Sequence, residues 1–412
     1  TYGETTWTRG ALHDWIKALR PSYVIDINRD TQLQDSYADV PHNLIVGIAR
    51  IQRSTGNLLA SYTMDANLNS VTALAVDSAG RPVVVGRSPA NNDGMLDLGV
   101  VRFLSNGNPD TSFSSDGMLA YNSTNSIARD EPLAVVTRSN GDIIVLVEEY
   151  LNTGAAHPFV LVSIPANGQN PGTLALGPTT TGLGGGAMRL QADGKLLVAV
   201  NVDINGSGCL RPRLFRFAAN TLVNLDSDFG NAGSVTLVPP GGTGCAPYVT
   251  SMALDAGGRI VLGAVANAVS SSASWIARVT ASGTLDTSFD SDGWMRLPRP
   301  INGSYHDVYG VGVQADGAIL AGGTFTHDNA SIGERPILSR VLPDGSADTS
   351  FNPATPSQVY TLGSNVLQQN ARALLMDGDR AVLAGIHLAT APQDYDFQIF
   401  RSKGTLPRHG FE

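Results

Sequence analysis

Short apolar segments alternate with tight polar turns along most of the chain. The pattern is clear in ALAVDSAGRPVVVG (73–86), AVVTRSNGDIIVLV (134–147) and VQADGAILAGG (313–323). A glycine in a tight turn between two apolar runs is a strong β-hairpin signal, because hairpin turns need a residue with positive φ. The chain is therefore predicted to consist of hairpins of short strands, with turn glycines at Gly80, Gly141, Gly194, Gly258, Gly317 and Gly378.

A second motif repeats with the same period. It occurs as NGNPDTSFSSDG (106–117) and SGTLDTSFDSDG (282–293), with weaker copies in LDSDFGNAG (225–233) and SADTSFNP (346–353). The phenylalanines of these copies are separated by 116, 60 and 62 residues, so the first gap holds two periods. They are Phe113, Phe229, Phe289 and Phe351.

Each repeat is interpreted as four strands, A to D, with the second motif linking each D to the next A. In the third repeat, A is 118–121, B is 133–137, C is 143–147 and D is 159–164. Tandem four-stranded units of this length are typical of the blades of a β-propeller.

The fold class is therefore all-β, a single β-propeller domain over residues 1–412. Seven D strands can be counted, which predicts seven blades of four antiparallel strands. Residues 1–44 depart from the pattern and form either a degenerate first blade or an N-terminal extension, and the alternative is six blades plus that extension.

The amino-acid sequence of the repeats is also informative. LDTSFDSDG (285–293), VQADGAILAGG (313–323) and WIARVTASGTLDTSF (275–289) resemble the delta-60 repeat family of bacterial β-propellers. The resemblance extends from about residue 45 onward. It implies an exported or surface-associated protein, and it implies no catalytic residues.

The repeated linker allows two interpretations. Asp286, Asp290 and Asp292 could form a calcium loop, although their spacing differs from that of known calcium loops. The favoured interpretation is structural: Asp and Ser cap backbone N–H groups in a turn, Gly adopts positive φ, and Phe packs between blades. No cofactor is predicted, Ca²⁺ is the open alternative, and other metal ligands are left unassigned.

The A–B and C–D loops should meet at one face, where their sequences vary, and function is expected there because variable loops on a rigid scaffold carry binding sites. Histidines near carboxylates could supply proton transfer or metal ligands, and tyrosines could stack on sugar rings. His157 and Tyr150 belong to this face. The predicted ligand contacts are Tyr305, His306, Asp307, His327, Asp328, His387, Asp394 and Tyr395.

Two cysteines fall in loops of neighbouring blades on the same face. Cys209 and Cys245 are predicted to form a disulfide, which would place the protein in an oxidising compartment. The chain begins at Thr1, and we interpret this as a mature form after signal-peptide removal. The expected location is extracellular, cell-surface or periplasmic.

Charge and motifs exclude several functions. A net charge of −9 and only three lysines argue against binding to nucleic acid, and no apolar run is long enough for insertion into a membrane. No G-x-S-x-G, H-E-x-x-H or P-loop motif is present, so no catalytic residue is assigned. The sequence favours a non-enzymatic module that binds a protein or glycan. A propeller hydrolase, lyase or lactonase with a metal- or His-based centre, and a structural component of an extracellular assembly, remain the alternatives.

Overall fold

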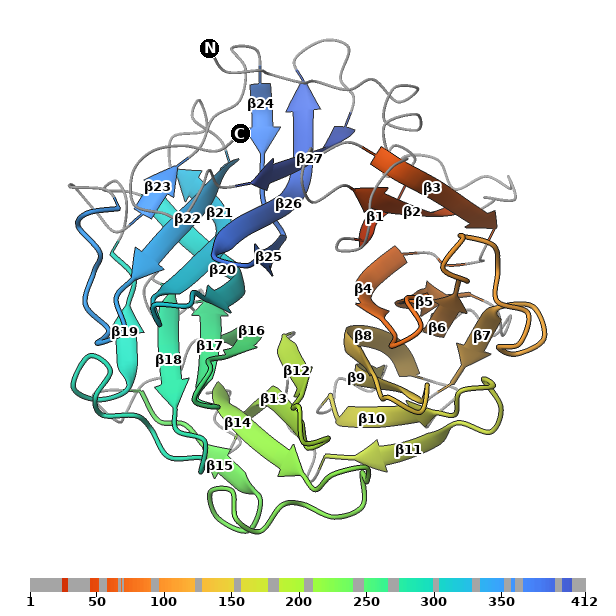
Figure 1. Ribbon diagram of the computed structural model, residues 1–412, viewed down its shortest axis with the longest axis horizontal. Coiled ribbons are helices and arrows are strands. Elements are labelled where there is room, and N and C mark those ends of the chain that lie inside the picture. The colour runs from red at the N-terminus through yellow and green to blue at the C-terminus, as the bar shows by residue number, and fades with distance from the viewer. Residues whose placement is uncertain are drawn as a thin grey trace.

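The described part of the chain consists of β-strands joined by turns. The computed structural model describes residues 24–28, 45–51, 58–65, 68, 70–89, 96–122, 128–151, 157–176, 185–203, 210–239, 248–265, 274–298, 304–327, 334–351, 357–359, 366–389 and 395–401. Among these residues every regular element is a strand, and all strand pairs are antiparallel within seven sheets that stand in a ring (Figure 1). The protein is a β-propeller, as the sequence predicts.

Strand order follows chain order in most sheets. The first sheet contains β1 (Val24–Asn28), β2 (Ile45–Ile51) and β3 (Leu58–Asp65). The second contains β4 (Ser70–Val76), β5 (Pro82–Ser88), β6 (Asp97–Arg102) and β7 (Met118–Tyr121). The third contains β8 (Ala128–Thr137), β9 (Ile143–Leu151), β10 (Phe159–Ile164) and β11 (Gly172–Ala175). The fourth contains β12 (Gly186–Leu190), β13 (Leu196–Asp203), β14 (Leu210–Phe217) and β15 (Ser234–Thr236).

The later sheets follow the same plan. The fifth contains β16 (Tyr248–Leu254), β17 (Ile260–Val265), β18 (Trp275–Val279) and β19 (Trp294–Arg296). The sixth contains β20 (Ser304–Val313), β21 (Ile319–His327), β22 (Glu334–Val341) and β23 (Ser357–Val359). The last contains β24 (Val366–Gln369), β25 (Ala373–Asp377), β26 (Arg380–Ala389) and β27 (Tyr395–Arg401). Because the first sheet has three described strands, the count of seven blades stays a prediction.

In the second to sixth sheets the first strand lies at the centre of the ring, next to the first strand of the neighbouring sheet, and in the last sheet β25 lies next to β20 (Figure 1). In the last sheet this inner strand is interrupted, because β24 and β25 are successive segments that pair with the same side of β26. The seven predicted D segments all form strands, namely β2, β6, β10, β14, β18, β22 and β27. In each four-stranded sheet the D strand is third, counted outward from the inner strand, and in the first sheet β2 is the middle one of three described strands.

The predicted grouping of strands into blades was wrong by one strand. Residues 118–121, predicted to open the third blade, form β7 and pair with β6 on the outer edge of the preceding sheet. The repeated linker therefore joins the third and fourth strands of one sheet, rather than one blade to the next. A tandem repeat has the same period wherever the unit is taken to begin, so the period could not decide this.

The predicted hairpin turns are confirmed. All six predicted turn glycines have positive φ, between 60° and 89°. Two residues of the linker are also left-handed in both strong copies: Ser114 and Ser115 have φ of 50° and 71°, and Asp290 and Ser291 have φ of 48° and 66°. Small polar residues tolerate this region best, which explains their repetition at these positions.

The repeated phenylalanine packs between sheets, as predicted. Phe289 has no exposed surface and belongs to one core cluster with Ile276 of the fifth sheet and Ile319 of the sixth. Arg278 of β18 covers its ring at 4.6 Å and donates from Nε to Asp286 Oδ2 at 2.7 Å. The same triad recurs in two other sheets, as Arg102, Asp110 and Phe113 and as Arg216, Asp226 and Phe229.

Two of the three linker carboxylates, those of Asp286 and Asp292, accept hydrogen bonds from protein donors. Asp286 accepts hydrogen bonds from Arg278 and from the backbone and hydroxyl of Ser288, and Asp292 caps the N–H of Trp294. Among the described residues, no group of three or more His, Cys, Asp or Glu side chains is placed to hold a metal ion. The same part of the chain contains no helix that could cross a lipid bilayer.

Candidate functional site at the loop face

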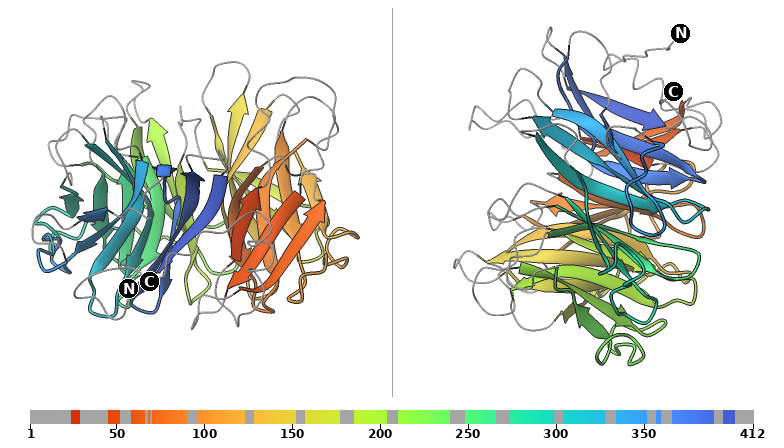
Figure 2. Two further views of the ribbon diagram at one scale, coloured as in Figure 1. Left: turned by 90° about the horizontal axis from the view of Figure 1, so that it is seen from above. Right: turned by 90° about the vertical axis from the view of Figure 1, so that its left-hand side faces the viewer.

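The sheets run between two faces that differ in their connections (Figure 2). The hairpin turns and the repeated linkers leave one face, which we call the turn face. The second-to-third-strand and sheet-to-sheet connections leave the opposite face, which we call the loop face, and much of their length lies outside the described residues. Every inner strand enters the ring from the loop face.

Four inner strands, β4, β8, β16 and β20, carry a β-bulge near the loop face. The strand register shifts between Val71 and Ala73, Pro132 and Ala134, Val249 and Ser251, and Val308 and Gly310. A bulge leaves one residue out of the ladder and re-aims its side chain, and bulges are common beside functional sites. The extra residues are Thr72, Leu133, Thr250 and Tyr309. In the last sheet Arg372 lies at the interruption between β24 and β25, with its N–H donating to Ala384.

One polar cluster lies on β8, β9 and the start of β10, and we call it the His157 group: Arg129, Glu131, Glu148, Tyr150 and His157. The Nδ1 atom of His157 is 3.5 Å from Oε1 of Glu148, whose side chain has no exposed surface, while the His157 side chain is 20% exposed. The ring centres of His157 and Tyr150 are 4.2 Å apart. The group thus combines an accessible imidazole with a buried carboxylate.

The electrostatics of the group follow from this burial. Burial, followed by the charges of Glu148 and Glu131, raises the pKa of Tyr150 to about 12, so its hydroxyl stays protonated at neutral pH. The guanidinium of Arg129 lies 4.6 Å from the centre of the Tyr150 ring and 3.9 Å from Glu131. Glu131 is also 3.4 Å from Arg87 of the second sheet, so the group extends across the junction between the second and third sheets.

A second polar cluster lies between the sixth and last sheets, and we call it the Arg372 group: Asp307, Tyr309, Glu334, Asn370 and Arg372. Arg372 donates from Nη1 to the Tyr309 hydroxyl at 2.7 Å, and its guanidinium lies 4.9 Å from the ring centre. Asn370 donates from Nδ2 to Glu334 Oε2 at 3.1 Å. The Tyr309 side chain favours the charged form of Asp307 and acts to lower the pKa of its carboxyl.

Burial dominates the ionisation of this group. It raises the pKa of Asp307, with Glu334 acting in the same direction and Arg372 against it. It raises the pKa of Tyr309 as well, and Asp307 adds to that shift. Asp307 is the predicted ligand contact that the structure brings into a polar cluster with other functional side chains.

The surroundings of His306 differ from those of its neighbour Asp307, as expected because adjacent residues on a strand point to opposite sides of the sheet. Only 4% of its surface is exposed, and neither ring nitrogen forms a hydrogen bond to the part of the chain that the structure describes. Burial lowers the pKa of His306 from 6.5 to about 3. This burial argues against contact with a ligand.

The buried imidazole is expected to make the fold acid-sensitive. The unfolded chain binds a proton at His306 near pH 6.5 and the folded chain only near pH 3, so stability is complete above about pH 6.5 and falls as the pH drops toward 3. Between pH 7.5 and 5 this one group should cost about 2 kcal/mol. Urea unfolding at both pH values should show that His306→Phe and His306→Leu have a shallower pH dependence than the wild type. Equal slopes in all three proteins would contradict the assignment.

The remaining predicted contacts are described only in part. Tyr305 lies in β20, His327 in β21, His387 in β26 and Tyr395 in β27, and for these four only the backbone is described. Asp328, Asp394, Cys209 and Cys245 lie outside the described residues, so the disulfide stays a prediction.

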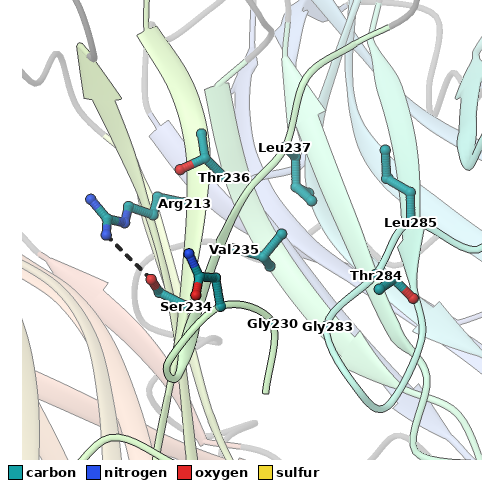
Figure 3. Close-up of a pocket in the computed structure, with 10 residues that line it drawn as sticks. Arg213, Gly230, Ser234, Val235, Thr236, Leu237, Gly283, Thr284 and Leu285 are labelled. Carbon is teal, nitrogen blue, oxygen red and sulfur yellow. Dashed lines mark hydrogen bonds between the residues drawn. The ribbon is translucent and has the colours of Figure 1, made fainter. Parts of the chain in front are cut away.

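A shallow hollow of about 550 Å³ lies away from both clusters, on the outer part of the ring beside β15 (Figure 3). Arg213 lies on one side of β15 and donates to Ser234 Oγ at 3.2 Å, while Leu285 lies on the other side. Its lining residues, all from the described part of the chain, include no Asp, Glu or His. The hollow therefore lacks groups for acid–base chemistry.

Sequence analysis missed Glu148, Glu334 and Arg372 as functional candidates, and Tyr309 as well. A signal for two of them exists in the repeat. Counting five residues back from the residue that begins each hairpin turn reaches the bulged residue in four sheets, and the six positions found in this way are occupied by Thr72, Leu133, Gly186, Thr250, Tyr309 and Arg372. The two large polar side chains stand out in this alignment. Nothing comparable marks Glu148 or Glu334.

Comparison with known families supports the fold. A family model described as "Domain of unknown function (DUF5122) beta-propeller" matches residues 83–113, 258–289 and 314–351. These segments span hairpins and linkers of the second, fifth and sixth sheets. The match supports a β-propeller family, and the delta-60 name stays a prediction. None of the curated proteins compared with the chain matches it.

Several solved structures are similar at low identity. The polysaccharide lyase Uly1 has a TM-score of 0.49 at 12% identity, with 86% of this chain and 84% of that chain covered. The β-propeller domain of the Trilobed protease from Pyrococcus furiosus has a TM-score of 0.42 at 9% identity, with coverages of 88% and 90%. An α-L-arabinanase from Penicillium chrysogenum has a TM-score of 0.44 at 14% identity, with coverages of 76% and 89%. Likeness at this level carries no information about activity.

Proposed function

We propose that the chain is a propeller enzyme of hydrolase or lyase type that uses His157 for proton transfer at the loop face. The observation that carries this proposal is the placement of the accessible His157 ring 3.5 Å from the buried carboxylate of Glu148 and 4.2 Å from the Tyr150 ring. Histidine is the side chain most often used for proton transfer, and a carboxylate behind it orients the ring. The proposal corresponds to the enzyme alternative of the sequence analysis, with His157 in place of the histidines predicted there.

In this mechanism each residue has a separate role. Nδ1 of His157 faces Glu148, so Nε2 is the nitrogen that accepts a proton from the substrate or from an attacking water. Glu148 is a positioning residue: its buried carboxylate, 3.5 Å from Nδ1, orients the ring electrostatically and stabilises the imidazolium that forms. The same proton then returns to the leaving group. Arg129, with a side chain 41% exposed, can stabilise negative charge on the substrate.

Replacing His157 by glutamine should lower kcat/KM by about 10²- to 10⁴-fold, because the proton-transfer group is lost while the side-chain volume is nearly kept. The measurement is turnover of neutral and acidic polysaccharides and of aryl esters by wild type and variant. Lys195→Gln on the turn face serves as the control, since it changes a charge far from the loop face. Glu148→Gln should change the pH profile of kcat as well as its height.

Two results would overturn the proposal. One is a His157→Gln protein with wild-type turnover. The other is a wild-type protein that turns over no substrate in the panel, which would favour the non-enzymatic binding module. The Arg372 group is the observation that supports such a module, because it gathers polar side chains around the solvent-exposed Arg372.

A further inference from the structure

The Arg372 group contains donors and acceptors in mixed charge states. Asp307 and Glu334 supply carboxylate acceptors, while Arg372 and Asn370 supply N–H donors. Tyr309 adds an aromatic ring and a hydroxyl. The residues come from β20, β22 and the interruption between β24 and β25, so two sheets contribute to one cluster.

The group is held in place by its backbone. Tyr309 occupies a bulge that Gly323 of β21 faces, and Arg372 is fixed by the hydrogen bond from its N–H to Ala384. Neighbouring Ala371 is tied to the sixth sheet, because its carbonyl accepts from the Thr324 hydroxyl at 2.9 Å. Arg372 itself is exposed to solvent and donates to a neutral partner, the Tyr309 hydroxyl, so most of its N–H groups point to no acceptor among the described side chains.

The mixture of charges decides between classes of ligand. An anion attracted by the guanidinium also meets two carboxylates, and a metal ion or an amine attracted by the carboxylates also meets the guanidinium, so a ligand of either charge loses part of its attraction. A neutral sugar fits, because each hydroxyl both donates and accepts, and neighbouring hydroxyls can bridge a carboxylate and a guanidinium. Tyrosine and arginine beside such a group add apolar and planar surface.

We propose that the Arg372 group is a carbohydrate-binding site for a neutral sugar unit, separate from the His157 group. The site binds through Asp307, Glu334 and Arg372, and Tyr309 positions Arg372. It does not depend on catalysis by His157, so the two proposals can fail independently.

The test is calorimetric titration of the full chain with neutral oligosaccharides of three to six units, built from glucose, xylose, arabinose or galactose. Oligogalacturonate and chitosan oligomers are the anionic and cationic arms. We expect binding of at least one neutral series, weakened at least tenfold by Arg372→Ala and by Asp307→Asn. Tyr309→Phe keeps the ring and should weaken binding less than Arg372→Ala does. His157→Gln and Lys195→Gln should leave the affinity unchanged.

Circular dichroism and thermal unfolding show whether each variant keeps its fold. If Arg372→Ala does not fold, Asp307→Asn, which is nearly isosteric with the wild type, still tests the proposal. The proposal is overturned by absence of binding to every neutral series at millimolar ligand. It is also overturned by binding confined to a charged arm, or by neutral-sugar affinity that both variants leave intact. Equal loss in His157→Gln would place the ligand at the other group instead.

Discussion

Replacing Gly323 by alanine is expected to destabilise the protein by about 3 kcal/mol or more, at the upper end of the usual cost of overpacking. A Cβ at this position would lie 1.8 Å from the carbonyl oxygen of Asp307 and 3.1 Å from the N–H nitrogen of Tyr309. Both are backbone atoms of the bulge in β20, so no rotamer change can relieve the contact. The same contact recurs at Gly86 against Ser70 and at Gly385 against Asn370.

The matched control is Gly172→Ala in β11, where an added Cβ meets nothing within 4 Å. Urea unfolding should give a much lower midpoint for Gly323→Ala than for Gly172→Ala, with Gly86→Ala close to the former. Neutral-sugar binding should be lost in Gly323→Ala at urea-free conditions where Gly86→Ala still binds, because only the former moves Asp307 and Tyr309. Equal midpoints for Gly323→Ala and Gly172→Ala would show that the bulges do not require glycine.

Replacing Phe289 by alanine is expected to cost about 3 to 5 kcal/mol, the range for a fully buried aromatic side chain. Phe289 has no exposed surface, fills the junction between the fifth and sixth sheets, and supports the guanidinium of Arg278. Its loss leaves a cavity and frees Arg278, which also donates to the carbonyl of Pro343 in the next linker.

Hydrogen exchange locates this effect. Amides of β18 and β22 should exchange faster in Phe289→Ala, while those of β5 and β6, at a distant junction, should change little. Val223→Ala is the control, since Val223 is 84% exposed and its truncation should change stability by less than about 0.5 kcal/mol. A Phe289→Ala protein as stable as Val223→Ala would mean that the repeated linker is not a structural device.

Much of the candidate site could not be predicted. Asp307 was named from its loop-face position, and it joins a cluster; its neighbour His306 was named for the same reason and is buried between sheets. Adjacent residues on a strand point to opposite sides, and which side faces solvent depends on the sheet that packs against it. Glu148 and Glu334 sit in ordinary strand positions, and only the neighbouring strands make them part of a group.

The sequence by itself determined the all-β class, the hairpins and the seven D segments, each of which forms a strand. These features are local: a glycine that needs positive φ, an apolar run of strand length and a repeated capping segment can each be read within a dozen residues. Only the tertiary structure decided that residues 118–121 close the preceding sheet, that Tyr309 in its bulge meets Arg372 at the interruption of the last sheet, and that His157 meets Glu148. These features depend on contacts between segments far apart in the chain. In a tandem repeat, the sequence alone is equally compatible with a strand that pairs with the unit before it and one that pairs with the unit after it.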